Sequence, residues 1–280
     1  MLNFKKLNAI AFFYFNAKLR NKNFNNPTFD PDFSIEEFIK KLNLEKNQII
    51  FLHVGLQQIR FKTNLSYEEI TERILKLLIK YYEPKAILVP TFCWSFIKSG
   101  LYSINYSKSE TGVFSEIFRK YSVFRTSHPI HNFSIISDKL EDFSLIDDSD
   151  TNSENGIYNY LFKNNCKIVN ISTREFRASP LHHVEFLNKL EYLNPTPSFN
   201  GVIYDKNDNS KKIKIFHAGS YAYKFSCALN KQKIKNFLIK KNISESIYYK
   251  ELEMVITDNQ TMYNTLESEL SRNPYFMITF

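Results

Sequence analysis

Two short apolar runs, each preceded by an amphipathic helical segment, constrain the fold of this chain most strongly. The runs are Gln48–Val54 (QIIFLHV) and Ala86–Thr91 (AILVPT), and their length and apolar character are typical of buried strands. The segments before them, Ser34–Leu42 and Ser66–Tyr82, each open with a Ser that has a Glu three residues later, which is the pattern of a capping box. This alternation of helix and strand predicts an α/β core with parallel strands. Ligands of such sheets bind beyond the carboxyl ends of the strands.

The rest of the chain continues the alternation and then changes to a hairpin and helices. In order, we expect a helix from Thr111 through Lys120, a strand at Phe133–Ile136, a short helix at Gly156–Phe162, a strand at Lys167–Ile171, a helix at Pro180–Leu190, a β-hairpin of Gly201–Tyr204 with Lys212–His217, a basic helix at Lys231–Lys240, a strand at Tyr248–Ile256 and a helix at Met262–Ser271. We interpret the whole chain as a single domain. It has an N-terminal extension (1–33), an α/β core (34–195) and a closing part with the hairpin, helices and last strand (196–280).

The composition is that of a globular chain, with 43% hydrophobic and 16% aromatic residues in a length of 280. Three scattered cysteines (Cys93, Cys166 and Cys227) have no paired spacing, which favours a reducing, cytoplasmic location and disfavours disulfides and a metal site. No apolar run is long enough to span a bilayer, so we expect no stable membrane insertion. The apolar stretch Asn8–Asn16 is predicted to pack as an N-terminal helix or strand, with contact to a membrane surface as the alternative.

The chain is basic, with a formal net charge of +8 and a pI near 9.1. Such a balance is compatible with nucleic acid, a membrane surface or an anionic small ligand. No nucleic-acid-binding motif occurs, so we expect no nucleic-acid partner. Basic residues gather at Lys211, Lys212 and Lys214 and from Lys231 to Lys241, where a solvated surface explains them equally well. A phosphate-bearing small molecule is the functional interpretation that fits best.

The stretch Ser179–Glu185 holds the residues most suited to chemistry. Pro180 favours the first turn of a helix, and on a helix His182 and Glu185 lie on one face because they are three residues apart. A histidine with a neighbouring carboxylate can transfer protons at neutral pH. His183 points to another side of the helix. A histidine followed three residues later by a glutamate also occurs by chance, so other segments must support a catalytic interpretation.

Several separated segments together resemble one family. They are Gly112 with Glu116 and Arg125–His131, which resemble its G-x-x-x-E and R-S-x-H-P-x-H segments; Ser179–Glu185, which resembles T-x-L-H-x-x-E; and His53–Leu56 and Pro90–Phe92, which resemble H-S-S-L and P-T-F. The family is that of the aminoglycoside 3-N-acetyltransferases, which includes relatives that acylate other amino sugars. The resemblance extends from about residue 35 to the end, and its motifs stand in the family's order.

The resemblance implies an α/β/α layered fold with a mixed sheet, and an enzyme that transfers an acyl group from acyl-CoA, acetyl or short-chain, to an amine. By motif position, His182 is the expected general base and Glu185 its carboxylate partner. Ser179 stands where the family has a Thr whose hydroxyl faces the thioester carbonyl. Direct transfer requires no covalent intermediate and no metal. A Cys–His nucleophile using Cys93 or Cys166 is a weaker alternative, because a small buried apolar residue explains either cysteine.

The same resemblance implies which residues contact the ligands. The cofactor-binding residues expected from it are His53, Val54, Gly55, Leu56, Thr91, Thr126 and Ser127, and the substrate-binding residues are His128, Glu116, Arg174 and Arg177. For three of these a structural role competes: His128 as a residue that fixes its loop, Glu116 as a carboxylate paired with Arg125, and His53 as a hydrogen-bonded structural histidine. Gly55 departs from the family, which has a Ser there, and so does the loop 172–178 (STREFRA), which replaces a more Gly-rich segment.

The charge of the chain favours an anionic acceptor. Sites for polycationic aminoglycosides are usually acidic, whereas this chain places Arg174 and Arg177 directly before the expected base, and Arg suits phosphate recognition. We therefore expect a nucleotide-linked amino sugar for surface-glycan synthesis, although the anionic CoA also explains part of the charge. The alternatives are an aminoglycoside acetyltransferase that confers antibiotic resistance, a non-catalytic sugar-binding relative, and a regulatory or membrane-associated protein. A homodimer is possible.

Overall fold

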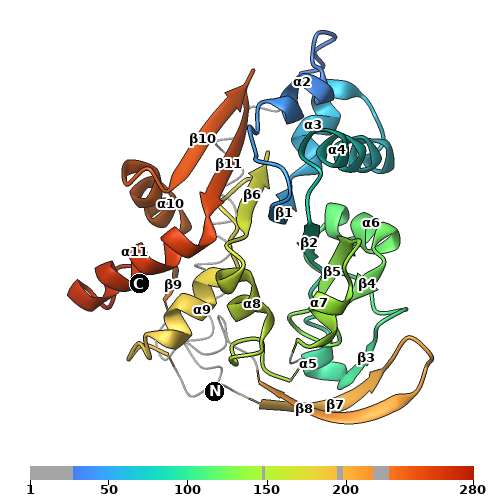
Figure 1. Cartoon of the computed structure of the whole chain (residues 1–280), viewed down its shortest axis with the longest axis vertical. Coiled ribbons are helices and arrows are strands. Elements are labelled where there is room, and N and C mark those ends of the chain that lie inside the picture. The colour runs from blue at the N-terminus through green and yellow to red at the C-terminus, as the bar shows by residue number, and fades with distance from the viewer. Residues whose placement is uncertain (1–27, 147–148, 194–197, 217–226) are drawn as a thin grey trace, which may run out of the picture.

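The computed structural model describes residues 28–146, 149–193, 198–216 and 227–280 (Figure 1). Its strands are β1 (Ile49–Val54), β2 (Ala86–Pro90), β3 (Leu101–Ser103), β4 (Phe124–Arg125), β5 (Phe133–Ser137), β6 (Lys167–Ile171), β7 (Ser198–Tyr204), β8 (Ser210–Phe216), β9 (Ala228–Leu229), β10 (Ser244–Tyr249), β11 (Leu252–Asp258) and β12 (Ile278–Thr279). Its helices are α2 (Ile35–Lys40), α3 (Leu56–Thr63), α4 (Tyr67–Tyr82), α5 (Phe96–Ser99), α6 (Val113–Tyr121), α7 (Glu141–Ser144), α8 (Ile157–Lys163), α9 (Pro180–Leu187), α10 (Lys231–Lys240) and α11 (Asn259–Arg272).

A seven-stranded mixed sheet with the order β10-β11-β6-β1-β2-β5-β4 organises the chain. Its centre is parallel, because β1 pairs in parallel with both β2 and β6, with Ile50 opposite Ile87 and His53 opposite Asn170. The outer pairs β2–β5, β5–β4, β6–β11 and β11–β10 are antiparallel, and Figure 1 shows β10 and β4 at opposite edges. The predicted parallel core and mixed sheet are therefore both confirmed.

Helices cover both faces of this sheet, because successive residues of its central strands point to opposite sides. On β1, Ile50 and Leu52 face a core that includes buried residues of α2, α3, α4 and α6. Ile49 and Phe51 face a second core with α8, α9, α10 and α11. Both faces of β1 are buried in this way, which explains why its sequence is continuously apolar and does not alternate. The layered α/β/α arrangement expected from the resemblance is confirmed.

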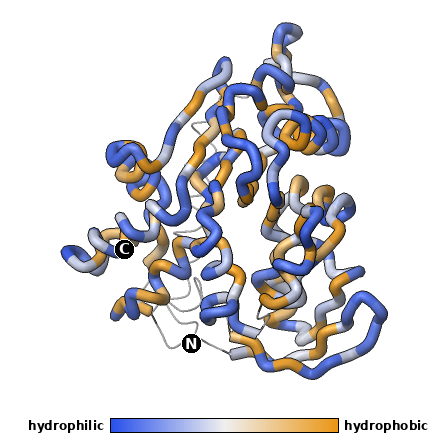
Figure 2. Tube along the Cα trace, in the orientation of Figure 1, coloured by the Kyte–Doolittle hydropathy of each residue, from blue (hydrophilic) through white to orange (hydrophobic). Residues whose placement is uncertain are grey.

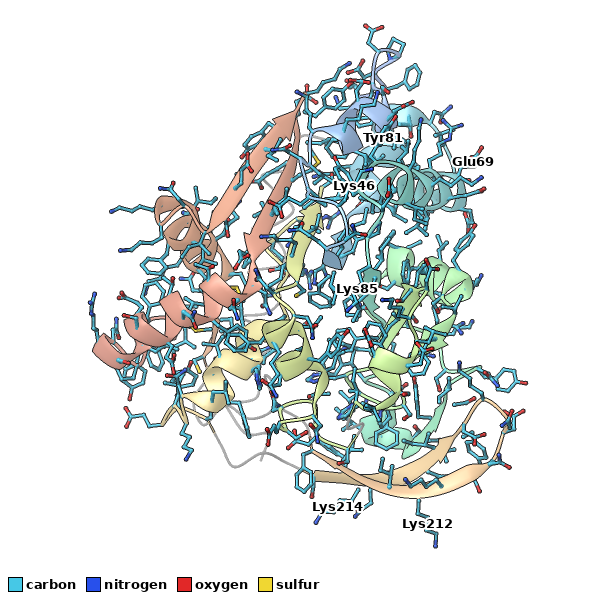
Figure 3. All side chains as sticks on the ribbon, viewed as in Figure 1. Lys46, Glu69, Tyr81, Lys85, Lys212 and Lys214 are labelled. Atoms are coloured by element: carbon cyan, nitrogen blue, oxygen red, sulfur yellow. The ribbon has the colours of Figure 1, made fainter. Side chains whose placement is uncertain are left out.

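The predicted hairpin is confirmed, because β7 pairs with β8 in antiparallel. It also forms a separate three-stranded sheet with β3, in the order β3-β7-β8, which was not predicted. It extends below the main sheet in Figure 1, and Figure 2 shows its turn as hydrophilic. Lys211, Lys212 and Lys214 are exposed on β8, and Lys212 and Lys214 point outward in Figure 3. These lysines belong to a solvated surface. The predicted end of the hairpin at His217 and the apolar stretch Asn8–Asn16 lie outside the described residues.

Some of the predicted elements differ in the structure. The single strand predicted at Tyr248–Ile256 is wrong, because Lys250 takes a left-handed conformation (φ 53°) and turns the chain between β10 and β11. The predicted capping box at Ser34 is half formed: Ser34 Oγ accepts from the Glu37 amide (3.2 Å), but the Glu37 carboxylate accepts from Lys40 Nζ (3.0 Å). The second predicted capping box, which opens α4, is complete.

Helix α3, which follows β1 directly, was not predicted, and α9 ends at Leu187, earlier than expected. Lys189 ends the turn after α9 with a φ of 46°, so the chain folds back beneath the helix. None of the helices in the described ranges is long and apolar enough to cross a membrane.

Candidate active site

A cavity of about 880 Å³ opens at the carboxyl ends of the three parallel strands. His53 and Val54 from β1, Pro90 from β2 and Ser172 after β6 line it, which is the position expected for the ligand site of such a sheet. The loop between β6 and α9 forms one wall, and the segment 110–115 with the start of α6 forms another. His182, at the start of α9, lies in the lining as well.

His182 and Glu185 form a close pair on α9, as their spacing predicts. His182 Nδ1 lies 2.9 Å from Glu185 Oε2, and the two side chains are 23% and 1% exposed. The other carboxylate oxygen, Glu185 Oε1, accepts a hydrogen bond of 2.9 Å from the hydroxyl of buried Tyr192. Glu185 itself lies behind the cavity wall, and its contact with the cavity runs through the imidazole of His182. A buried carboxylate is stable only with such partners.

The neighbouring His183 points into the core, as its position on the helix predicts. Its Nδ1 lies 3.0 Å from Asn152 Oδ1, and its ring packs between Tyr158 and Tyr263 at centroid distances of 6.0 and 5.5 Å. Burial lowers the pKa of His183 to about 4, so this imidazole is neutral at physiological pH. Its role is in packing, and it is distinct from that of His182.

Ser179 precedes α9 and lines the cavity beside His182. Its hydroxyl makes no capping hydrogen bond with the helix. Pro180 occupies the first turn, where a missing N–H costs nothing. Ser179 and His182 therefore line the same cavity at the start of α9, and the side chain of Ser179 also lies within reach of the buried Tyr158 hydroxyl.

His53 lies on the floor of the cavity at the end of β1. Its Nε2 atom is buried and has no hydrogen-bond partner among the described residues. Burial first, and then the positive charges of Arg177 and Lys231, lower the pKa of His53 to about 3. This imidazole is thus a neutral side chain, and it packs edge-on against Phe51 with 4.9 Å between ring centroids.

Positive side chains gather on the wall that the β6–α9 loop forms. Arg174 donates to Gln57 Oε1, while Arg177 Nη2 and Lys231 Nζ lie 2.8 and 3.2 Å from Glu175 Oε1. Three cations and one carboxylate leave this wall with a net charge of +2. Lys231 belongs to α10, so residues far apart in the sequence build this part of the cavity.

Asn170, near the end of β6, fixes the backbone of this loop. Its Oδ1 accepts from the Arg177 amide (2.8 Å) and from Thr173 Oγ1 (3.1 Å), and its Nδ2 donates to the Arg177 carbonyl (3.0 Å). The side chain is 1% exposed. Arg177 therefore projects from a backbone that the sheet holds in place.

The structure sorts the expected ligand-binding residues into two groups. The cavity is lined by His53, Val54, Gly55, Leu56, Arg174, Arg177, Ser179 and His182. Other expected contacts lie behind the wall, in hydrogen bonds that hold the loop 125–132. Thr91 Oγ1 donates to Asn132 Oδ1 (2.7 Å), and Thr126 Oγ1 accepts from the Phe133 amide (3.0 Å). Ser127 also falls outside the lining.

His128 and Glu116 are likewise held by the protein itself, away from the cavity lining. His128 Nδ1 accepts from the His131 amide (2.8 Å) and its Nε2 lies 3.1 Å from the Phe216 carbonyl, so the ring ties its loop to β8. The expected partner of Glu116 was wrong: its carboxylate pairs with Arg119 Nη2 at 2.8 Å, not with Arg125. Arg125 instead donates to Asn132 Oδ1 at 2.9 Å.

Sequence reasoning missed several residues of the site. Trp94, Glu110, His131, Glu175 and Lys231 line the cavity, and Tyr192 completes the contacts of Glu185. His131 is the last residue of a recognised motif segment and Trp94 follows another by two residues, so both had an available signal in the sequence. Lys231 and Tyr192 gave no such signal, because only the folded chain brings them to the site.

Neither Cys93 nor Cys166, the two cysteines considered as nucleophiles, lines this cavity. Cys166 is fully buried, and burial raises the pKa of its thiol. Cys93 is also buried, 3.2 Å from Arg125 Nη2, and burial raises the pKa of its thiol as well. Both side chains fit the alternative of small buried residues. The described part of the chain contains no cluster of His, Cys, Asp and Glu side chains that could hold a metal ion.

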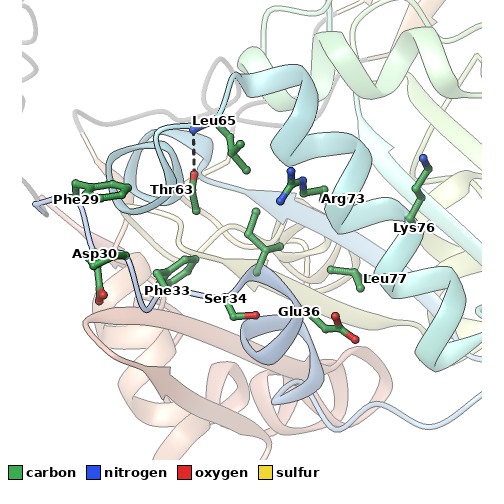
Figure 4. Close-up of a pocket in the computed structure, with 12 residues that line it drawn as sticks. Phe29, Asp30, Phe33, Ser34, Glu36, Thr63, Leu65, Arg73, Lys76 and Leu77 are labelled. Atoms are coloured by element: carbon green, nitrogen blue, oxygen red, sulfur yellow. Dashed lines mark hydrogen bonds between the residues drawn. The ribbon is translucent and has the colours of Figure 1, made fainter.

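A second cavity, of about 580 Å³, lies between the loop 28–34 and helix α4 (Figure 4). Arg73 and Leu77 of α4 face Phe33 and Ser34 across it. It shares no lining residue with the first cavity and contains none of the expected site residues. The combination of imidazole, hydroxyl and cations occurs at the carboxyl ends of the strands.

Known proteins share this fold. A crystal structure of the aminoglycoside acetyltransferase AAC(3)-IVa as apoenzyme matches with a TM-score of 0.64 and 12% identity, covering 86% of this chain and 89% of that one. The complex of AAC-IIIb with CoASH matches with a TM-score of 0.69 and 13% identity over 85% and 94%. The YokD protein of Bacillus subtilis matches with a TM-score of 0.65 and 16% identity over 89% and 96%. At these identities the matches show a common fold.

The family is shown by the match of the sequence to a family model. A search of the curated proteins found no match to the chain. A sequence model described as aminoglycoside 3-N-acetyltransferase matches residues 71–270, which is well over half of the chain and includes the cavity's loop, α9 and α10. The chain therefore belongs to the aminoglycoside 3-N-acetyltransferase family and is an N-acyltransferase.

Proposed function

We propose that this enzyme acylates the amine of a nucleotide-linked amino sugar, with His182 as the general base. The observation that carries the proposal is the pair of His182 Nδ1 and Glu185 Oε2, 2.9 Å apart at the wall of a cavity with three cations. The family supplies the reaction type, and the geometry of this pair supports the choice of base.

The contact with Glu185 determines which imidazole nitrogen can act. A neutral His182 that donates from Nδ1 to the carboxylate keeps the lone pair on Nε2. That nitrogen can take the proton which the amine loses as it becomes a nucleophile. The carboxylate then stabilises the imidazolium while remaining ionised.

Ser179 is suited to act on the carbonyl oxygen of the donor. Ser179 lines the cavity and does not cap α9, so its hydroxyl is suited to donate a hydrogen bond to an oxygen that gains negative charge. The helix dipole at the start of α9 also favours negative charge there. This is the role that the family Thr has at the corresponding position of the motif.

The cavity also fits an acyl-CoA. Arg174, Arg177 and Lys231 suit the phosphates, and the apolar and aromatic lining, which includes Leu56, Phe92 and Trp94, suits an uncharged arm. Acyl-CoA supplies an activated acyl group: a C–N bond forms to the amine as the C–S bond breaks, and the thiol leaves. No side chain of the protein needs to carry the acyl group.

The charge of the loop wall supports the choice of a phosphate-bearing acceptor. Its net charge of +2 favours a diphosphate-bearing acceptor over a polycation. An aminoglycoside is the second candidate, and Glu110 favours it, because this exposed carboxylate lies in the opposite wall. CoA alone could use the same cations, so the experiment must separate donor from acceptor.

The first experiment measures thiol release from acetyl-CoA with nucleotide-linked amino sugars, free amino sugars and aminoglycosides. We expect turnover with the nucleotide-linked sugars. Turnover with aminoglycosides alone would make the second candidate correct, and no turnover with any acceptor while acetyl-CoA binds would favour the non-catalytic alternative.

A second experiment assigns the arginines. Arg174→Gln and Arg177→Gln should raise the KM of the nucleotide sugar by roughly tenfold each, while the KM of the same sugar without its nucleotide stays constant. A rise in the KM of acetyl-CoA that is absent with acetyl-pantetheine would assign them to the donor instead. Arg73→Gln, in the cavity of Figure 4, is the matched control and should change neither KM.

A further inference from the structure

We infer that Tyr192 is a positioning residue of the acyl transfer, which acts by holding Glu185 ionised and aimed at His182. The inference rests on the proposed role of His182 as base. It adds a third member, which lies seven residues beyond Glu185 and outside the helix that carries the pair.

The contact itself is well defined. Tyr192 Oη donates to Glu185 Oε1 at 2.9 Å, while Glu185 Oε2 faces His182 Nδ1 at the same distance. Tyr192 is 0% and Glu185 1% exposed. Burial and the nearby carboxylate raise the pKa of Tyr192, so its hydroxyl keeps its proton and serves as a donor. Each oxygen of the carboxylate therefore has its own partner.

The backbone after α9 explains how Tyr192 reaches this place. The helix ends at Leu187, and Lys189 turns the chain in a left-handed conformation. Leu190 and Tyr192 then pack back into the core that contains Leu181 and Val184 of α9. In a continuous helix, residue 192 would lie about 10 Å along the helix axis from Glu185 and could not contact its carboxylate.

Other titratable groups surround the pair but do not substitute for this hydrogen bond. Burial first, and then the charge of Glu185, raise the pKa of the Cys227 thiol on the segment before β9, so this thiol remains neutral. The titratable side chains that line the cavity together with His182 are His53, Tyr67, Glu110, His131, Arg174, Glu175, Arg177 and Lys231. None of these makes a hydrogen bond to Glu185 that the structure defines among the described residues.

The physical consequence is a change in proton affinity. The Tyr192 hydrogen bond stabilises the deprotonated carboxylate, and the same carboxylate contacts His182 through its other oxygen. Loss of the donor should raise the proton affinity of the pair, whichever member takes the proton. Since the base works only when the imidazole is neutral, the acid limb of the pH–rate profile should move to higher pH.

The test is Tyr192→Phe, which removes the hydroxyl and keeps the ring. We expect the acid limb of kcat/KM to move up by about half a unit to one unit, and kcat at neutral pH to fall roughly tenfold with little change in KM. Tyr275→Phe is the matched control, because Tyr275 packs on Tyr192 (6.1 Å between ring centroids) but donates to Glu191. An unshifted profile, or an equal shift in the control, would overturn the inference.

Two further measurements separate this inference from the proposed function. The titration of His182 followed by NMR without substrates should show the same upward shift in Tyr192→Phe. If the His182 titration shifts upward in Tyr192→Phe while His182→Ala retains turnover, another residue is the base, but the effect of Tyr192 on the His182–Glu185 pair is confirmed. If His182→Ala abolishes turnover and the titration is unshifted, the inference fails and the base stands. In a protein that already carries Glu185→Gln, the addition of Tyr192→Phe should not shift the titration of His182 any further.

If Tyr192→Phe does not fold, NMR measurements on the wild-type protein still test the inference. The Tyr192 hydroxyl proton should exchange slowly with water and show NMR contacts to Glu185. The Glu185 carboxyl carbon should report an ionised group until the coupled pair titrates. A rapidly exchanging hydroxyl, or a carboxyl that titrates independently of His182, would contradict the inference.

Discussion

The carbonyl oxygen of Ser172 lies where a Cβ on residue 55 would be, so the close approach of two loops leaves room for Gly55 alone. The Ser172 carbonyl carbon and Thr173 Cα would also meet that Cβ, at 2.8 and 3.2 Å. The Gly55 amide donates to the Ile171 carbonyl at 2.8 Å, which continues the pairing of β1 with β6. The two departures from the family motifs, Gly55 and the loop 172–178, are therefore linked, because the backbone of the loop occupies the space that a side chain at residue 55 would need.

Any side chain at residue 55 should displace this loop. We expect Gly55→Ala and Gly55→Ser to lower kcat/KM by roughly tenfold or more and to destabilise the protein by about 1–3 kcal/mol, because the contact is with rigid backbone. Steady-state kinetics and urea unfolding measure both effects. If Gly55→Ser were more active than the wild type while Gly55→Ala were less active, a hydroxyl at this position would contact the ligand as it does in the family.

The sequence predicted the central sheet and the reactive pair because both depend on local patterns. Apolar runs identify β1, β2 and β6, and a spacing of three residues brings His182 to Glu185. Motif matches did not tell which way a side chain points. Thr91 and His128 match family segments, yet their polar atoms bind the protein's own loops.

The site residues that the sequence did not predict are brought to the cavity by contacts between distant segments. Lys231 reaches the cavity from α10, and Asn170 fixes Arg177 from within an apolar strand. Neither residue has a local pattern that distinguishes it from a surface lysine or a polar residue in a strand. Tyr192 required the backbone reversal at Lys189, which a helical pattern extended to Leu190 did not anticipate.

Replacement of His182 should separate catalysis from packing. His182→Ala should reduce kcat by roughly two to four orders of magnitude, because proton transfer in the transition state is lost. His183→Gln is the control on the adjacent residue, and it should lower the melting temperature while retaining most of the turnover, because His183 is buried against Asn152 and Tyr158. Equal losses of turnover in both variants would show that α9 as a whole, and not His182, had been disturbed.

Stability should fall as the solution becomes acidic, because His53 and His183 are neutral in the folded protein. Their folded pKa values are about 3 and about 4, below the ordinary value of 6.5, so the unfolded chain binds protons first. Their contribution to stability is therefore complete above pH 6.5 and is lost as pH falls toward the folded values. Each should cost roughly 1.4 kcal/mol of unfolding free energy per pH unit over that range.

Urea unfolding at neutral and mildly acidic pH measures this slope. His183→Gln should flatten it, since glutamine does not titrate, even if the variant is less stable at neutral pH. His182→Gln serves as the comparison, because that side chain is partly exposed in the cavity and paired with Glu185. A slope that His183→Gln leaves unchanged would mean that other groups cause the acid sensitivity.

Ligand binding should be visible in the fluorescence of Trp94, the single tryptophan of the chain, which lines the cavity. Its ring packs edge-on against Phe92 and His131, at centroid distances of 5.6 and 5.7 Å, and is partly exposed. A ligand that enters the cavity displaces water from this indole and should change its emission. Titration with CoA and with nucleotide-linked amino sugars would give Kd values independent of turnover.

The charge of the loop wall should make the binding that Trp94 fluorescence reports selective for phosphate-bearing ligands. In Arg177→Gln the Kd of phosphate-bearing ligands should rise by roughly tenfold, and added salt should weaken their binding to the wild type more than to the variant. Lys212→Gln, on the outer strand of the hairpin, is the control of equal charge change and should alter neither the Kd nor its salt dependence. Equal effects of the two variants would show that the net charge of the chain, and not the wall beside His182, attracts the ligand.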